Sequence, residues 1–243
     1  MQIALESLTK RFGSLRALEN ISLTIQPGQI VGILGPNGRV RRRCFDVFPP
    51  SQRPTVDAFS MMANNSTAVA STCASGLDFC LNSVIFPQLT VARHIAMVLG
   101  LYGKDGESTA SIVTQHLHEL DLLPAIDTPI GQLSRGQIYK AALATLLSAD
   151  PELWLLDEPF ASGMDPIGIA YFKRQARLAV ERGRTILYST QILDVAEKFS
   201  DRVCLIHRGK LRVFDAVANL HVRPRGEDCV LEDVFRQLRE EEQ

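Results

Sequence analysis

The sequence predicts an α/β protein with one domain built on a largely parallel sheet. Its second half alternates short apolar runs with stretches of helical spacing, which is typical of parallel strands joined by helices. A candidate buried strand, Ile30–Leu34, runs directly into Gly35. The length of 243 residues and the apolar content of 46% suit a single domain, with room for a subdomain and a sizeable core.

The predicted elements follow from apolar spacing and from turn residues. Strands are expected at 3–5, 17–25 and 30–34, with Pro27-Gly28 as the turn before the third. Thr90 is a plausible N-cap for the first helix. The remaining signals predict helices at 90–101, 108–123, 134–149, 166–182 and 192–199, and strands at 153–156, 185–189, 202–207 and 210–214.

Composition excludes several classes of protein. A net charge of −1 argues against nucleic acid as a partner of the whole chain. The five cysteines are odd in number and form no C-x-x-C pair, which favours reduced thiols in the cytosol over a disulfide framework or a zinc site. Met1 leads into mixed polar sequence, so we expect no signal peptide, and no apolar run reaches the ~18 residues of a membrane span.

Three short segments carry candidate chemistry. Gly35-Pro36-Asn37-Gly38 follows a strand and could cradle phosphate on backbone N–H groups, although such a run is more often an ordinary turn. Asp157 and Glu158 end an apolar strand, where the first could hold Mg²⁺ and the second could polarise an attacking water. Ser134 and the Gly136 N–H begin a helix and could bind a phosphate, unless Ser134 is simply an N-cap.

Together, in this order and spacing, the segments resemble the ATP-binding subunit of ABC transporters over about residues 1–38 and 84–235. L-S-R-G-Q (133–137) stands where that family has its L-S-G-G-Q signature, 20 residues before L-W-L-L-D-E-P (153–159). S-G-M-D (162–165) matches the D-loop. L-E-D-V-F (231–235) is similar to a C-terminal motif of exporter-type members.

The resemblance implies a P-loop NTPase fold of ABC type in residues 1–243, with an N-terminal antiparallel β part and a helical subdomain at about 88–148. It implies ATP and Mg²⁺ as cofactors. It also implies two partners, a membrane permease and a second cassette that binds head to tail, with the chain held on the cytoplasmic face of the membrane. The implied site residues are Glu158 and Gln191 for catalysis, Asp157 for Mg²⁺, and Phe12, Gly35, Pro36, Asn37, Gly38, Arg41, Ser134, Gly136, Gln137 and Asp165 for the nucleotide.

The phosphate loop departs from the family pattern. The expected G-P-N-G-A-G-K-[ST]-T is replaced by G-P-N-G-R-V-R-R-R. Val40 is stiff and bulky where backbone must approach phosphate closely. Arg41 keeps the charge of the missing lysine but not its compact shape, and Arg42 cannot ligate Mg²⁺ as a hydroxyl would. This chain is therefore expected to bind ATP feebly.

Two further motif positions also differ. The Q-loop glutamine is expected near Leu81 and Asn82, and Asn82 is the nearest amide. The switch histidine is replaced by Gln191 in Y-S-T-Q-I, which can donate a hydrogen bond to a γ-phosphate but cannot carry a proton.

A frameshift over residues 39–83 would explain the first two departures. Four of the five residues 39–43 are arginine, and residues 58–77 carry no charged side chain. If GCG GGT AAG ACG ACG CTG, encoding A-G-K-T-T-L, loses its first base with T following, it reads CGG GTA AGA CGA CGC TGT, which encodes the R-V-R-R-R-C of 39–44. We hypothesise that the frame shifts near Gly38 and is restored between Gly76 and Val84.

Two alternatives to an active transport ATPase remain. The first is a non-catalytic cassette that acts as the structural or regulatory partner of an active one, and whose Ser134–Gln137 segment completes the partner's site. The second is a soluble ABC ATPase of translation or DNA repair. The second fits less well, because such proteins carry two cassettes or a long coiled coil.

Overall fold

The structure is a computed structural model, and it describes residues 2–12, 15–35, 79–80, 86–104, 106–220 and 231–232. Its main sheet has the strand order β4-β5-β6-β3-β7-β8, and β1 and β2 form a separate antiparallel pair. All neighbours in the main sheet are parallel except β7 and β8. The predicted α/β class, with a mostly parallel sheet and an antiparallel N-terminal part, is confirmed. The strands are β1 (Ile3–Phe12), β2 (Leu15–Ile25), β3 (Ile30–Leu34), β4 (Phe79–Cys80), β5 (Leu153–Asp157), β6 (Thr185–Thr190), β7 (Arg202–His207) and β8 (Lys210–Ala216).

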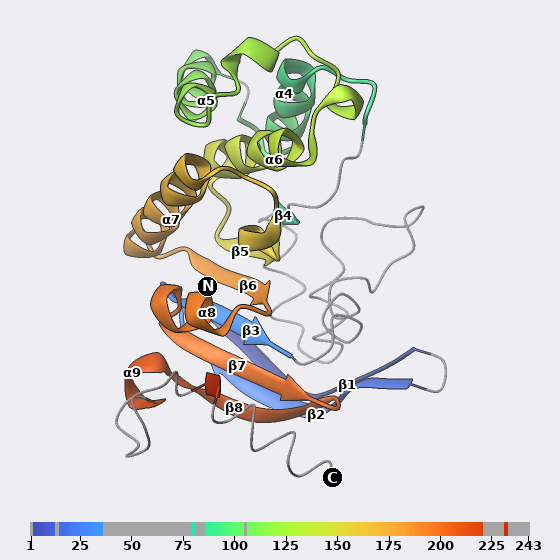
Figure 1. Ribbon diagram of the computed structural model, residues 1–243, viewed down its shortest axis with the longest axis vertical. Helices are drawn as coiled ribbons and strands as arrows, with labels where there is room; N and C mark the ends of the chain where they lie inside the picture. Colours follow the sequence, from blue (N-terminus) through green and yellow to red (C-terminus); the bar gives the residue numbers. More distant parts are fainter. Residues whose placement is uncertain are drawn as a thin grey trace.

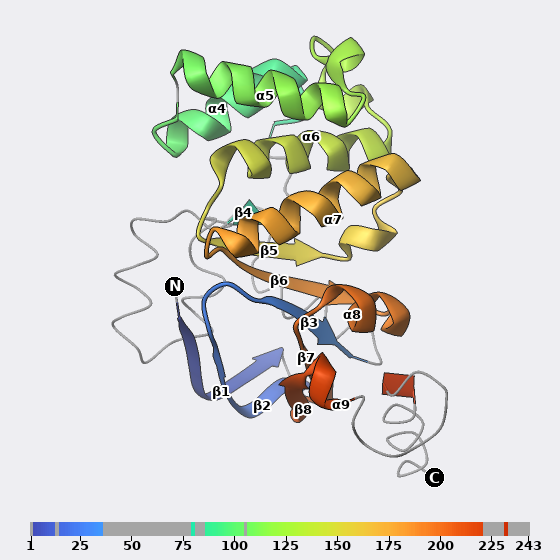
Figure 2. The ribbon, with the colours of Figure 1, turned by 90° about the vertical axis from the view of Figure 1, so that its left-hand side faces the viewer.

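The helices form layers around this sheet (Figure 1). Helices α4, α5 and α6 gather at one end of the molecule, and the β1–β2 pair lies at the other. Figure 2 shows α7 lying between α6 and strand β5. The helices are α4 (Val91–Leu101), α5 (Glu107–Glu119), α6 (Arg135–Ala149), α7 (Pro166–Glu181), α8 (Leu193–Phe199) and α9 (Val217–Leu220), with short 3₁₀ turns η1 (Leu123–Ala125), η2 (Ile130–Gln132) and η3 (Pro159–Ala161).

The central strands carry no charged side chain between Ile30 and Leu34 or between Thr185 and Thr190, and they are largely apolar because both faces of the sheet are covered. Along β5, Trp154 and Leu156 join the core beneath the helices, whereas Leu153 and Leu155 join the core that also contains the inner side chains of β1 and β2. Along β6, the same alternation puts Tyr188 with the first core. A run of mostly apolar residues without charge is therefore what this buried position requires.

Two predicted boundaries were wrong. The helix expected at 108–123 ends at Glu119, because Asp121 adopts a left-handed conformation (φ 51°) and the chain then enters η1. The apolar residues that suggested a longer helix, Leu120 and Leu122, are nevertheless buried in the core. The first strand extends to Phe12 rather than stopping near Leu5, since register shifts let the pairing with β2 continue.

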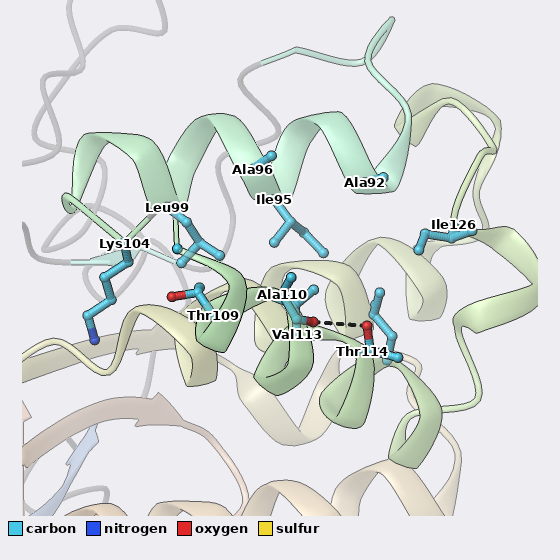
Figure 3. Close-up of a pocket in the computed structure, with 12 residues that line it drawn as sticks. Ala92, Ile95, Ala96, Leu99, Lys104, Thr109, Ala110, Val113, Thr114 and Ile126 are labelled. Atoms are coloured by element: carbon cyan, nitrogen blue, oxygen red, sulfur yellow. Dashed lines mark hydrogen bonds between the residues drawn. The ribbon is translucent and has the colours of Figure 1, made fainter.

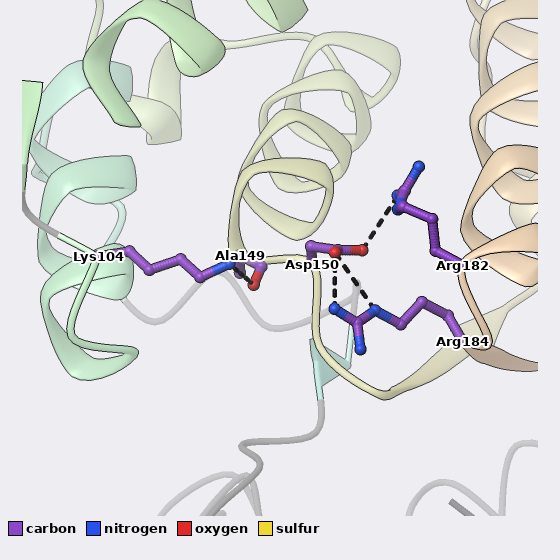
Figure 4. Close-up of polar contacts among 5 residues, drawn as sticks. All are labelled: Lys104, Ala149, Asp150, Arg182 and Arg184. Atoms are coloured by element: carbon purple, nitrogen blue, oxygen red, sulfur yellow. Dashed lines mark hydrogen bonds and ion pairs between the residues drawn. The ribbon is translucent and has the colours of Figure 1, made fainter. Parts of the chain in front are cut away.

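Polar contacts tie the helical end to the sheet (Figure 4). Asp150 caps α6 in a left-handed conformation and accepts hydrogen bonds from Arg184, at 2.9 and 3.3 Å, and from Arg182, at 3.2 Å. Both arginines lie between the end of α7 and β6. On the other side, the Lys104 ammonium donates to the Ala149 carbonyl at 2.7 Å. The carboxyl end of α6 is thus held from two directions.

Within the described ranges, no helix is long and apolar enough to cross a membrane.

Candidate functional site

The first group of candidate residues lies where three parallel strands end side by side. Asp157 is the last residue of β5, and Gln191 follows the last residue of β6 directly. Asp157 pairs with Ser189 across the sheet, and Leu34 pairs with Thr190 on the other side of β6. Since Gly35 follows Leu34, these carboxyl ends meet at one edge of the sheet, where α/β proteins bind ligands.

Ser189 organises the two acidic residues of this edge. Its buried hydroxyl donates to Asp157 Oδ1 at 2.5 Å and accepts the Glu158 N–H at 3.1 Å. Glu158 has a left-handed backbone, with φ 48° and ψ 52°. A residue other than glycine is strained in this backbone conformation, and such strained residues concentrate at functional sites. The hydrogen bond from its N–H helps to hold Glu158 in this conformation at the end of the strand.

The second group of candidate residues joins the start of α6 to the start of α7. Ser134 and Gln137 form a capping box, in which the Ser134 N–H donates to Gln137 Oε1 at 3.0 Å and the Gln137 N–H donates to Ser134 Oγ at 3.3 Å. Asp165 caps α7 by accepting the Gly168 N–H at 2.7 Å, and it forms an ion pair with Lys140 of α6. The N-terminal ends of the two helices are therefore linked through side chains.

Gly136 and Gly163 bring the backbones of this second group into direct contact. A Cβ atom at Gly136 would lie 2.4 Å from the Gly163 carbonyl oxygen, closer than real Cβ atoms approach. Gly163 itself has φ +84°, a conformation that favours glycine. The glycine of L-S-R-G-Q is thus required by close packing against the loop that precedes α7.

This contact gives a matched pair of glycine substitutions. Gly136→Ala is expected to destabilise the protein by about 1–3 kcal/mol, because backbone atoms must move apart. Gly100→Ala in α4 should instead stabilise it by about 0.5–1 kcal/mol, since a Cβ there meets nothing within 4 Å and alanine favours the helix. Urea unfolding of both variants tests this. A Gly136→Ala variant as stable as the wild type would show that the close contact is not maintained.

The charge on Asp165 also makes a pH-dependent contribution to stability. The hydrogen bond with Lys140, and then that from the Gly168 N–H, lower the pKa of the Asp165 carboxyl below its ordinary value. Because the pKa is lower in the folded state, this contribution is present above the unfolded pKa, near 4, and is lost as the pH falls through the folded value.

We expect the unfolding free energy of Asp165→Asn to change less with pH below about pH 4 than that of the wild type. The pH-dependent contribution that is lost should be less than about 1 kcal/mol, because the carboxylate is partly exposed to solvent. Urea midpoints measured between about pH 3 and 7 give the slope. Lys140→Met should flatten the curve in the same way, and the double variant should add little. Independent effects of the two substitutions would contradict this coupling.

Several candidate residues lie outside these two groups. Phe12 is the last residue of β1, where its backbone pairs with Leu15. Of the C-terminal motif, only Leu231 and Glu232 are described; Leu231 is buried and its N–H donates to Glu197 at 2.9 Å. The other candidates lie outside the described residues: Pro36, Asn37, Gly38, Arg41, Leu81 and Asn82.

Sequence reasoning missed two residues of these groups, Ser189 and Lys140. Ser189 lies in the quoted Y-S-T-Q-I, but only the strand register reveals that it faces Asp157. Lys140 had a usable signal. It is a charged residue within an otherwise apolar stretch of α6, and a buried lysine requires a partner.

Comparison with known proteins identifies the family. A family model described as ABC transporter matches residues 18–161, more than half of the chain. The chain belongs to the ABC transporter family. The two groups of residues described above lie at the carboxyl ends of β5 and β6 and at the starts of α6 and α7.

Relatives and solved structures agree with this assignment. The chain is 27% identical over 97% of its length to the probable multidrug ABC transporter ATP-binding protein YbhF of Escherichia coli, and it spans 41% of that relative. It is 25% identical to the ABC-type transporter ATP-binding protein EcsA of Bacillus subtilis, covering 99% of this chain and 97% of EcsA.

The solved structures show the shared fold. An ATP-binding subunit of an ABC transporter matches with a TM-score of 0.77 at 19% identity, over 97% of this chain and 98% of the other. A dimeric bacterial ABC transporter cassette matches with a TM-score of 0.69 at 22% identity, over 89% and 99% of the two chains.

Proposed function

We propose that this cassette is the ATP-binding subunit of an ABC exporter, and that it couples ATP binding and hydrolysis to transport through a membrane permease. The observation that carries the proposal is the strand edge where Asp157, Glu158 and Gln191 come together. Export is favoured by two relatives, one named as a probable multidrug transporter protein and one as a Nod factor export protein, whereas a third is named as a sulfate/thiosulfate import protein. The permease would hold the cassette at the cytoplasmic face of the membrane.

The donors at the strand edge suit Mg²⁺ and ATP. Mg²⁺ is usually held by one or two carboxylates together with phosphates and water, rather than by a cage of protein ligands. The described residues contain no cluster of three or more His, Cys, Asp or Glu side chains that could hold a metal, but they do place Asp157 and Glu158 at this edge. The residues therefore fit a metal that arrives with its nucleotide.

Each residue of the edge then has a separate task. Asp157, oriented by the Ser189 hydroxyl, would hold Mg²⁺, and Glu158 would orient and polarise the attacking water. Gln191 would donate a hydrogen bond to the γ-phosphate. Bound Mg-ATP supplies the phosphoanhydride bond that is broken. Gly35 would begin the phosphate loop, and Phe12 would stack on the adenine.

The second group of residues would serve the nucleotide of a partner cassette. In a head-to-tail dimer, Ser134, Gly136 and Gln137 of one chain would face the phosphate loop of the other. The capping box and the Lys140–Asp165 ion pair give this part of the chain a fixed geometry. Combined with the R-V-R-R-R run at 39–43, this arrangement supports a second candidate function, a non-catalytic partner that completes the site of an intact cassette while its own phosphate loop is damaged.

The condition of the phosphate loop decides between the two candidates. Resequencing the gene across codons 38–84 tests the frameshift directly. A missing or extra base would make the arginines an artefact and favour an ordinary transport ATPase. If the arginine codons stand, the non-catalytic partner is favoured.

The matching biochemical test compares the chain as written with one whose reading frame is restored across 39–83. We expect the chain with the arginine run to lack two charge-assisted hydrogen bonds to the phosphates, each contributing about 1.5–3 kcal/mol. It should therefore bind Mg-ATP at least about 100-fold more weakly than the restored chain. Calorimetric titration measures the difference. In the restored chain, Glu158→Gln should retain binding and lose hydrolysis. Tight Mg-ATP binding by the chain with the arginine run would contradict a damaged phosphate loop. Hydrolysis that survives Glu158→Gln would contradict the catalytic role of Glu158.

A further inference from the structure

A cavity of about 290 Å³ lies between α4 and α5, away from both groups of candidate residues (Figure 3). Its walls come from α4, from α5 and from the segment that joins them, with Ile126 at one end and Lys104 at the other. Side chains of packed helices normally interdigitate and leave few gaps larger than a water molecule. A hollow of this size needs an explanation in the side chains that surround it.

Three alanines leave the two helices apart. Ala92 and Ala96 are four residues apart on α4 and therefore lie on the same side of that helix, and Ala110 lines the cavity from α5. Ala96 and Ala110 are exposed, so the cavity opens to solvent between them. Larger apolar side chains at these positions would close the gap.

The lining is apolar along its length and polar at one end. Ile95 and Leu99 of α4 face Val113 of α5, and Leu117 also lines the cavity. The Thr114 hydroxyl lies on the Ile126 side and donates to the Ala110 carbonyl of its own helix at 2.9 Å. Lys104 and Thr109 line the opposite end from Ile126. A long apolar slot with a few polar groups at one end is typical of sites for small amphipathic molecules.

The charge at the polar end selects the head group of such a molecule. The Lys104 ammonium uses one of its three N–H donors on the Ala149 carbonyl, at 2.7 Å, and its other donors can serve an anion at this end of the cavity. A cationic head group would be repelled by Lys104. Among the described residues that line the cavity, none is acidic; Asp105, next to Lys104, lies outside the described residues.

We propose that this cavity binds a straight-chain aliphatic carboxylate, with its tail between α4 and α5 and its carboxylate at Lys104 and Thr109. An apolar cavity of about 150 Å³ holds benzene, so this one, at about twice that volume, suits roughly twelve non-hydrogen atoms. Free carboxylates of about eight to ten carbons have this size. The site is separate from the proposed nucleotide site and does not depend on it.

The binding test is a titration of the ¹⁵N-labelled chain with sodium decanoate, followed by amide chemical shifts. We expect saturable shifts confined to α4, α5 and the residues around Lys104, with a Kd on the order of 0.1–1 mM for a ligand of this size. Decyltrimethylammonium and 1-decanol share the tail but lack the carboxylate, and both should bind at least about tenfold more weakly. Absence of saturation at about 10 mM decanoate would overturn the proposal. Equal binding of decanol would also overturn it, because the cavity would then be a general apolar surface such as one that accepts a partner's side chain.

Two sets of variants separate the tail from the head group. Ala96→Leu with Ala110→Leu fills the mouth of the cavity and should weaken decanoate binding by at least about tenfold, whereas Ala170→Leu, at an exposed position of α7, should leave it unchanged. Lys104→Met should weaken decanoate binding about tenfold, and Lys104→Arg should retain it within about threefold. Circular dichroism checks that each variant is folded. Full decanoate affinity in a folded Lys104→Met or cavity-filling variant would contradict the site.

Discussion

Trp154→Ala is expected to destabilise the protein by about 3–5 kcal/mol, the largest effect of any single substitution we propose. Trp154 is the second residue of β5 and is fully buried, packed into the core beneath the helices. Its backbone pairs with Phe79 on one side and with Ile186 on the other. Truncation would remove the largest fully buried side chain of the described core and leave a cavity that neighbouring strands cannot close.

Trp154→Phe is the informative control. The Trp154 Nε1–H is buried and has no hydrogen-bond partner among the described residues, so its removal relieves the cost of an unsatisfied donor. We therefore expect Trp154→Phe to destabilise the protein by about 1 kcal/mol or less, although its ring is smaller. Urea unfolding measures both free energies. Equal losses for the two variants would mean that the indole N–H has a partner, rather than being a destabilising group.

The sheet could be predicted from sequence because each central strand is buried on both faces. The runs around Trp154 and Tyr188 are uninterrupted by charge, and the helix that follows β5 has a regular apolar stripe. The end of α5 could not be predicted in this way. Leu120 and Leu122 continue the apolar pattern into the core after the helix has ended. The pattern therefore reports which residues are buried and does not show where the helix ends.

The candidate site was predictable as a set of motifs but not as a set of contacts. Asp157, Glu158 and Gln191 were found because each follows an apolar strand at a characteristic position. The residues that orient these motifs are distant in sequence. Ser189 and Asp157 are 32 positions apart in the sequence. Lys140 of α6 pairs with Asp165 at the start of α7. Such pairings depend on strand register and helix packing, which no local pattern encodes.

Asp150→Ala is the second substitution with a large expected effect, about 3 kcal/mol of lost stability. Two costs combine. The carboxylate of Asp150, which is 21% exposed, loses its contacts with Arg184 and Arg182, and the charged, partly buried Arg184 loses its acceptor. Asp150 also has φ 44°, and a left-handed alanine costs about 1–2 kcal/mol.

Asp150→Gly separates these costs, because glycine accepts the left-handed backbone but supplies no carboxylate. We expect it to be more stable than Asp150→Ala by about 1 kcal/mol and still less stable than the wild type. Arg182→Met is a matched control. Arg182 is 49% exposed, so its contact with Asp150 should contribute less than about 1 kcal/mol, whereas Arg184→Met should cost more. Equal stability of the alanine and glycine variants would show that the backbone at residue 150 relaxes.

The position of Asp150 makes the same substitutions informative about function. Asp150 caps the end of α6, whose N-cap is Ser134, and its arginine partners precede β6, which ends at Thr190, between Ser189 and Gln191. If the Asp150 contacts couple α6 to the end of β6, Asp150→Ala should speed amide hydrogen exchange in both elements together. Faster exchange in α6 alone would mean that the two groups of site residues are held independently, and that Asp150 only stabilises its own helix.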